Sequence, residues 1–152
     1  MDNDEREIIA VLDGLYAMIS GPAGPRDWRK QSQFFHPDCR QMRTGKDDAG
    51  GPWIKSFSPE QYREEADAIF VNRSFYEIEI AREIRVFGNM AHVWSAYEAK
   101  LDPADTQPER RGINSIQFYN DGDGWRIISM IWDNERPPEF MLEHGFPAGM
   151  RL

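Results

Sequence analysis

The chain has 152 residues and a formal net charge of −8, from 26 acidic and 18 basic side chains. This length suits one domain of ordinary size, and the acidic balance disfavours nucleic acid, because phosphate binding needs a basic patch. Cys39 is the one cysteine, which excludes an internal disulfide, and no stretch approaches the roughly 20 apolar residues of a membrane span. Together with an acidic N-terminus that lacks a signal-peptide pattern, these features predict a cytoplasmic protein without membrane contact.

The N-terminal part of the chain has the spacing of helices. Apolar side chains at steps of 3–4 residues predict a first helix over residues 8–19. Its apolar face is formed by Ile8, Ile9, Val11, Leu12, Leu15, Tyr16 and Ile19. After a loop rich in Gly and Pro, Asp27 is expected to cap a second helix over residues 28–35, which His36 and Pro37 end.

Two short strands and a capped helix are predicted next. The strands cover residues 40–44 and 53–57. Ser58, Pro59 and Gln61 have the spacing of a capping box, so a third helix is expected from there to about residue 70.

The second half of the chain alternates in the manner of strands. Tyr76, Ile78, Ile80, Ile84 and Val86 alternate with charged residues, which predicts a strand with the apolar set buried and the charges in solvent. Three more strands are expected over residues 91–101, 113–119 and 125–133, joined by turns. Because helices and strands are segregated along the chain, the fold class is α+β. We expect one domain over residues 1–135 and an irregular C-terminal tail over residues 136–152, in which His144 is exposed.

Three local features together resemble a known superfamily. They are the aromatic segment from Phe34 to Arg40, the capped helix at Ser58, and the closing hairpin from Ser115 to Ser129. With this order of elements, the chain from about Arg6 to Trp132 is similar to the nuclear transport factor 2-like superfamily, the SnoaL-like or cystatin-like α+β cone. The resemblance implies three N-terminal helices packed on the concave face of a strongly curved, mixed, mainly antiparallel sheet. It implies no single function, because such folds serve isomerases, dehydratases, cyclases, epoxide hydrolases and non-catalytic binding domains.

The ketosteroid isomerases of this superfamily use a tyrosine, a carboxylate base and a protonated acid. By position within the elements, the resemblance places Tyr16, Arg43 and Asn114 in those roles. An arginine cannot abstract a proton at neutral pH, so the isomerase mechanism is not carried over. These three side chains would instead hold an oxygen-rich or anionic group at the polar end of an apolar pocket. Two alternatives stay open, namely that Arg43 pairs with an internal acid or that the strand register differs by one residue.

The remaining pocket residues follow from strand alternation. Ser95 and Tyr97 would face the pocket from the return strand, Trp132 from the last strand, and Trp53 from a short strand. Ile116, Ile128 and Met130 share that face and are expected to be core residues. His36, Asp38 and Asp133 are the acid–base groups that would have to reach the pocket in an enzyme.

The opposite face of the sheet has a different character. His92 and Trp94 alternate with the inward residues, so they predict an outer face at which two copies form a homodimer. We expect no metal and no cofactor, because ligand spacing and phosphate-binding loops are absent from the sequence. The function predicted is a small-molecule-binding domain of unidentified ligand. The alternatives are a lyase, isomerase or hydrolase acting on a small hydrophobic carbonyl or cyclic substrate, and a non-catalytic dimerisation module.

Overall fold

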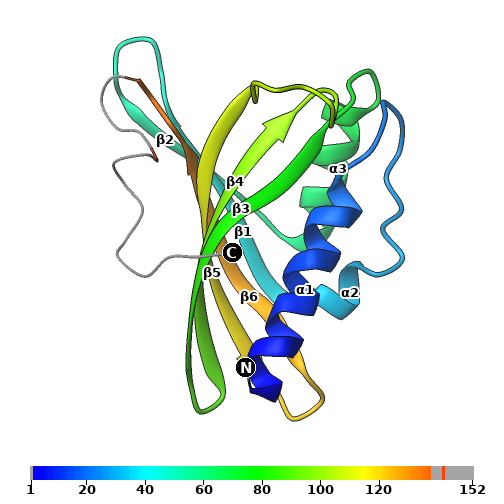
Figure 1. Ribbon diagram of the computed structural model, residues 1–152, viewed down its shortest axis with the longest axis vertical. Coiled ribbons are helices and arrows are strands. Elements are labelled where there is room, and N and C mark those ends of the chain that lie inside the picture. Colours follow the sequence, from blue (N-terminus) through cyan, green and yellow to red (C-terminus); the bar gives the residue numbers. More distant parts are fainter. Residues whose placement is uncertain (1, 138–141, 143–152) are drawn as a thin grey trace.

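A six-stranded mixed sheet with helices on one side forms the molecule (Figure 1). The computed structural model describes residues 2–137 and 142. The helices are α1 (Asn3–Ile19), α2 (Gln31–Phe34) and α3 (Pro59–Phe70). The strands are β1 (Phe35–Lys46), β2 (Pro52–Phe57), β3 (Tyr76–Phe87), β4 (Met90–Lys100), β5 (Arg110–Asn120) and β6 (Trp125–Asn134).

The sheet has the strand order β2-β1-β6-β5-β4-β3. Only the β1–β6 pair is parallel among the strands that the structure describes, and the remaining neighbours are antiparallel. The segregation of helices and strands predicted from the sequence is confirmed. No helix of the described residues is long and apolar enough to cross a membrane.

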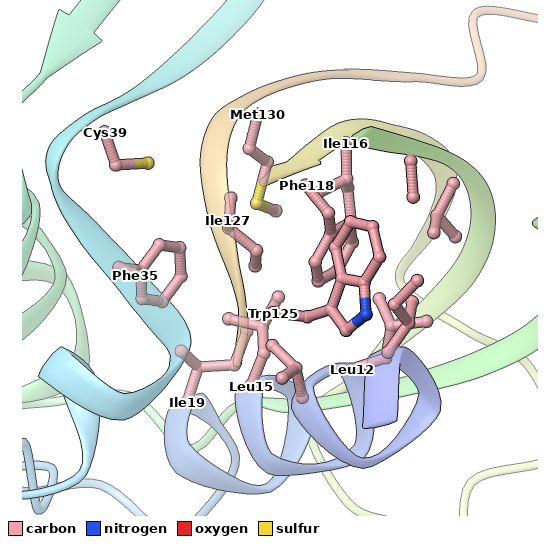
Figure 2. Packing of buried hydrophobic residues seen from close by; sticks show 14 of the residues in the cluster. Leu12, Leu15, Ile19, Phe35, Cys39, Ile116, Phe118, Trp125, Ile127 and Met130 are labelled. Atoms are coloured by element: carbon pink, nitrogen blue, oxygen red, sulfur yellow. The ribbon is translucent and has the colours of Figure 1, made fainter. Parts of the chain in front are cut away.

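The main hydrophobic core lies between α1 and the sheet. Leu12 and Leu15 are at most 1% exposed, and they meet Ile116, Phe118 and Ile127 from the sheet (Figure 2). Trp125 lies in the middle of this group, and its indole nitrogen donates to Asp4 over 3.0 Å. The 3–4-residue spacing of the first helix therefore predicts the correct buried face.

The second helix differs from its prediction. It covers four residues, and its N-cap is Lys30 without a capping side chain. Asp27 does not cap it, because its carboxylate accepts from the backbone nitrogen and the guanidinium of Arg29. Phe35 already belongs to β1, which then continues through Pro37 with a register shift against β6 between Phe35 and Arg40.

The third helix begins as predicted. The Ser58 hydroxyl accepts from the Gln61 backbone nitrogen over 3.2 Å, and the Gln61 side chain accepts from the Ser58 nitrogen over 2.9 Å. This capping box begins α3, which packs against β1 and β2.

The predicted buried face of β3 is wrong for its first half. A register shift between Glu79 and Ala81 turns the strand, so that Glu77 and Glu79 point toward the helices while Ile78 is 41% exposed. Beyond the shift, Ile84 packs against the core as expected. One extra residue in a strand reverses which side chains face the core beyond it. A prediction from alternating apolar and charged residues therefore assigns the wrong face on one side of the bulge.

A second shift affects the last hairpin. The β5–β6 register changes between Gln117 and Phe118, so Ile127 pairs with Phe118 and is fully buried. Ile127 therefore takes the core position expected for Ile128, whereas Ile116 and Met130 are core residues as predicted. Of the C-terminal tail, Leu142 is buried against Ala81 and Ala96 on the other side of the sheet. Position 144 lies outside the described residues.

Candidate functional site

A cavity of about 110 Å³ lies between α3 and the inner face of the sheet. Aromatic and aliphatic side chains form most of its wall. They are Ile19, Phe57, Tyr62, Ala66, Ile69, Phe70, Phe75, Tyr97, Met130 and Trp132. The polar contributors are Arg43, Glu65, Glu77, Arg110, Asn114 and Asn134. An apolar lining with a few convergent polar groups is typical of a small-molecule site.

Hydrogen bonds join the polar side chains at one wall of the cavity. The Asn114 amide donates to the Tyr16 hydroxyl over 2.9 Å and to Glu77 Oε1 over 3.3 Å. The Tyr16 hydroxyl lies 2.7 Å from Ser95 Oγ, and Ser95 donates to Glu79. Strands β3, β4 and β5 therefore present one connected polar group to the end of α1.

The Glu77 carboxylate accepts fewer hydrogen bonds than Glu79, the other carboxylate of this network. Among the described residues, the Asn114 amide is the one hydrogen-bond donor to Glu77. Burial raises the pKa of Glu77 to about 7, against the lowering effects of Asn114 and Arg110. A carboxyl group that changes charge near neutral pH can hold a cation when ionised and donate a hydrogen bond when protonated.

Tyr16 does not line the cavity but lies behind Asn114, where it stays a neutral hydroxyl. Burial, followed by the negative charge of Glu77, raises the pKa of Tyr16 well above its ordinary value of 10.0. Glu79 differs from Glu77, because the Arg82 guanidinium donates to Glu79 over 2.6 Å. Glu77 has no comparable cationic partner in the described part of the chain, while Glu79 belongs to a paired structural group.

Arg43 lines the same cavity as Asn114 but is paired with an acid. Its Nη2 atom lies 3.0 Å from Glu65 Oε1, so it pairs with an acid of α3, as one of the open alternatives allowed. Its guanidinium lies 5.8 Å from the Trp53 ring centroid, and its Nε atom is buried without a hydrogen-bond partner. Tyr16 and Asn114 are thus brought together by a hydrogen bond, whereas Arg43 binds Glu65 instead of either of them.

The other predicted pocket residues divide into two groups. Tyr97 and Trp132 line the cavity, where the Tyr97 hydroxyl donates to Asn134 over 2.5 Å and Trp132 meets Tyr62 edge to face. Ser95 is fully buried behind the cavity wall within the hydrogen-bond network. Trp53 does not line this cavity but a groove at the β1–β2 end of the sheet.

Comparison with solved structures identifies the fold. A cystatin-like protein of unknown function from Nostoc punctiforme aligns with a TM-score of 0.69 and 13% identity over 92% of this chain and 98% of its own. An NTF2-like protein from Cytophaga hutchinsonii aligns with a TM-score of 0.66 and 12% identity over 89% of this chain and 100% of its own. This chain has the NTF2-like fold.

The same fold occurs in a protein with a more specific description. The beta subunit of a putative aromatic-ring-hydroxylating dioxygenase from Novosphingobium aromaticivorans aligns with a TM-score of 0.64 and 16% identity, covering 86% of this chain and 88% of its own. No family profile and no curated protein matches the sequence. The likeness therefore concerns the NTF2-like architecture.

Within this NTF2-like fold, the acid–base groups proposed from the sequence do not line the cavity. His36 Nδ1 accepts from the Asp38 backbone nitrogen over 3.0 Å, which is a local turn contact. Burial acts to raise the pKa of Asp133, but hydrogen bonds from Arg136 and the Asn134 nitrogen lower it overall. No cluster of three or more metal-ligating side chains occurs within residues 2–137 and at 142.

The sequence interpretation missed Glu77 as a residue of the NTF2-like cavity. Its alternation with isoleucines placed it on the solvent side. A signal was nonetheless present, because Arg82 stands where the apolar series of Ile78 and Ile80 should continue, and the apolar Ala81 stands among the charged positions. A strand whose alternation is interrupted in this way is a candidate for a bulge.

Proposed function

We propose that the chain is a small-molecule-binding domain, whose ligand lies between α3 and the concave face of a curved sheet. The observation that carries this proposal is the cavity in which an aromatic lining surrounds Glu77 and Asn114. Its polar groups come from β1, α3, β3, β5 and β6, so distant segments are brought to one ligand. The free, buried Cys39 suits a reducing compartment, and we propose a cytoplasmic location.

The size of the cavity limits the ligand. Its volume of about 110 Å³ is well below the roughly 300–1,000 Å³ of ordinary ligand pockets, and near the ~150 Å³ of an engineered cavity that binds benzene. The proposed ligand is therefore a compact molecule with few heavy atoms, carrying one polar group, and a steroid-sized substrate is too large.

The test uses a variant that fills the cavity. Ala66 lines the cavity and is 3% exposed, whereas Ala68 is exposed on the same helix. A panel of small aromatic and branched molecules is screened by ligand-observed NMR. Saturable binding that Ala66→Leu abolishes and Ala68→Leu preserves is the expected result, with circular dichroism reporting the fold of each variant. Binding that is equal in both variants would place the ligand elsewhere and contradict the proposal.

A second candidate function is an enzyme acting on a small carbonyl or cyclic substrate. The specific observation favouring it is Glu77, which lines the cavity and has a pKa of about 7. Such a carboxylate can take a proton from a bound molecule at neutral pH. The check is exchange of ligand carbon-bound protons for deuterium in D₂O, followed by NMR. Exchange that the wild type accelerates and Glu77→Gln does not would support an enzyme, and exchange at the solvent rate in both proteins would exclude this one.

A third candidate is association of two copies through the outer face of the sheet, as a dimerisation module. The favouring observation is a groove of about 730 Å³, whose lining includes Trp94, Ile113 and Ile131. The Nε1 atom of Trp94 is buried there without a hydrogen-bond partner. His92, on the same strand, lies 3.1 Å from Ser115 Oγ. Sedimentation velocity should show a dimer that Trp94→Arg dissociates and Phe87→Ser, at the exposed end of β3, preserves. A wild-type monomer at all concentrations would overturn it.

A further inference from the structure

The Glu77 carboxylate lacks the partners that a buried charge normally has. The structure gives it one hydrogen bond, the long 3.3 Å contact from Asn114, and no ion pair with any described Lys or Arg. Neighbouring Glu79, in contrast, accepts from both Ser95 and Arg82. Placing a carboxylate in an apolar site is costly unless it is paired, so Glu77 has unused capacity to bind a positive group.

Aromatic side chains that could contact such a group line the same cavity as Glu77. Tyr62 and Trp132 are nearly perpendicular, with an interplanar angle of 88° and centroids 6.2 Å apart. Phe75 and Tyr97 line the same cavity. Faces of aromatic rings attract cations, and sets of rings of this kind recognise substituted ammonium groups.

The arginines of the cavity do not oppose a cation with their full charge. Arg43 is paired with Glu65 at 3.0 Å, which leaves that side of the cavity nearly neutral. Arg110 is exposed at the first position of β5 and forms no ion pair with Glu77. Among the described residues, ionised Glu77 is therefore the unpaired negative charge of the cavity. The exposed Arg110, which also lines the cavity, offsets this charge only in part, because burial still raises the pKa of Glu77 against the lowering effect of Arg110.

We infer that the ligand of this cavity carries a compact organic ammonium group, which pairs with the Glu77 carboxylate and packs against the faces of Tyr62 and Trp132. This inference rests on the proposed small-molecule site and names the chemistry of its ligand. It replaces the expectation of an anionic ligand at Arg43, because Glu65 already pairs with that guanidinium. The cavity of about 110 Å³ admits a branched or methylated amine of a few carbon atoms.

The test uses three probes of similar shape and different charge. Tert-butylammonium, tert-butanol and pivalate share one branched carbon skeleton, and their affinities for the full chain are measured by calorimetry and NMR. We expect the ammonium to bind at least tenfold more tightly than the alcohol, and the carboxylate to bind most weakly. The ammonium affinity should rise about tenfold from pH 6 to pH 8, as a carboxyl group with a pKa of about 7 becomes ionised.

Three variants identify the responsible group. Glu77→Gln should remove both the preference for the ammonium and its pH dependence, while Glu83→Gln on the same strand should keep them. Glu77→Asp, which keeps the charge, should retain the preference for the ammonium and shows that a loss in Glu77→Gln is not a loss of fold.

The outcomes separate this inference from the proposed function. Equal binding of the three probes, or tighter binding of pivalate, would overturn the inference and leave the small-molecule site in place. Absence of binding by all three probes, together with a negative ligand panel, would contradict the proposed function itself.

Discussion

The side-chain amide nitrogen of Asn114 lies 2.9 Å from the hydroxyl oxygen of Tyr16, although 98 positions separate the two residues in the sequence. The same nitrogen lies 3.3 Å from Glu77 Oε1. Asn114 is 1% exposed, and its contact with Tyr16 is buried, whereas its contact with Glu77 is partly buried. One amide therefore links α1 to β3 and fixes the polar wall of the cavity.

Replacing Asn114 should be costly because it leaves the buried Tyr16 hydroxyl and the partly buried Glu77 carboxylate with fewer donors. We expect Asn114→Ala to lower the free energy of unfolding by about 1–3 kcal/mol. Gln117→Ala is the matched control, since Gln117 is an exposed amide on the same strand and should change stability by less than about 0.5 kcal/mol. Chemical denaturation measures both values. Equal losses in the two variants would show that the Asn114 hydrogen bonds do not stabilise the fold.

Glu77 should make stability depend on pH. Burial raises the pKa of Glu77 from its ordinary value of 4.5 to about 7, so the folded state holds a proton that the unfolded state has released between these values. The free energy of unfolding gained from this proton is fully present below pH 4.5 and is lost as pH rises through 7. Because Glu77 is half-buried, we expect a loss of about 1–2 kcal/mol between pH 5 and pH 8 relative to Glu77→Gln.

Urea denaturation at several pH values measures this difference. Glu83→Gln provides the comparison, because Glu83 lies on the same strand beyond the register shift and accepts from Arg85. Its profile should follow the wild type. If Glu77→Gln also follows the wild type, then Glu77 ionises in the folded protein as it does in the unfolded chain, and the pH argument is wrong.

The sequence predicted correctly the helix starts and turns that are determined by residues close together in the chain. The capping box at Ser58 and Gln61 was predicted correctly because both partners lie within one turn of helix. Strands β4 to β6 were also predicted to within a few residues, since turn residues such as Gly88 and Gly122 have positive φ angles in the structure. The predicted helix at residues 28–35 failed because Asp27 binds Arg29 instead of capping.

The candidate site was only partly predictable. Tyr16 and Asn114 are joined by a hydrogen bond, but of the two only Asn114 lines the cavity, and their role in holding a ligand stays a prediction. Glu77 was missed because the shift between Glu79 and Ala81 depends on pairing with β4, which no local pattern specifies. The Arg43–Glu65 pair joins a strand to a helix, so the sequence could suggest an internal acid as the partner of Arg43 but could not identify Glu65.

The Arg43–Glu65 pair should contribute little to stability, because both side chains are partly exposed. We expect Glu65→Gln to lower the free energy of unfolding by at most about 1 kcal/mol. The larger effect should be on ligand preference, since the variant leaves the Arg43 guanidinium unpaired at the cavity. Pivalate should therefore bind Glu65→Gln at least threefold more tightly than the wild type, by roughly 0.7 kcal/mol.

Glu64 offers the control for this change, because it is exposed and precedes Glu65 on α3. Glu64→Gln removes the same formal charge without touching Arg43. Calorimetric titration with pivalate compares the two variants. An equal gain in both would mean that overall charge, and not release of Arg43, changes the affinity.

The capping box at the start of α3 should support the cavity as well as the helix. Ser58→Ala removes the acceptor for the Gln61 backbone nitrogen and should lower the free energy of unfolding by about 1 kcal/mol. The first turns of α3 also carry Tyr62, which lines the cavity, so ligand affinity should fall together with stability. Ser56→Ala is the control, because Ser56 accepts only a surface contact from Arg40 among the described residues. Denaturation and ligand titration of both variants test this link, and unchanged affinity in a destabilised Ser58→Ala protein would show that the cavity does not depend on how α3 begins.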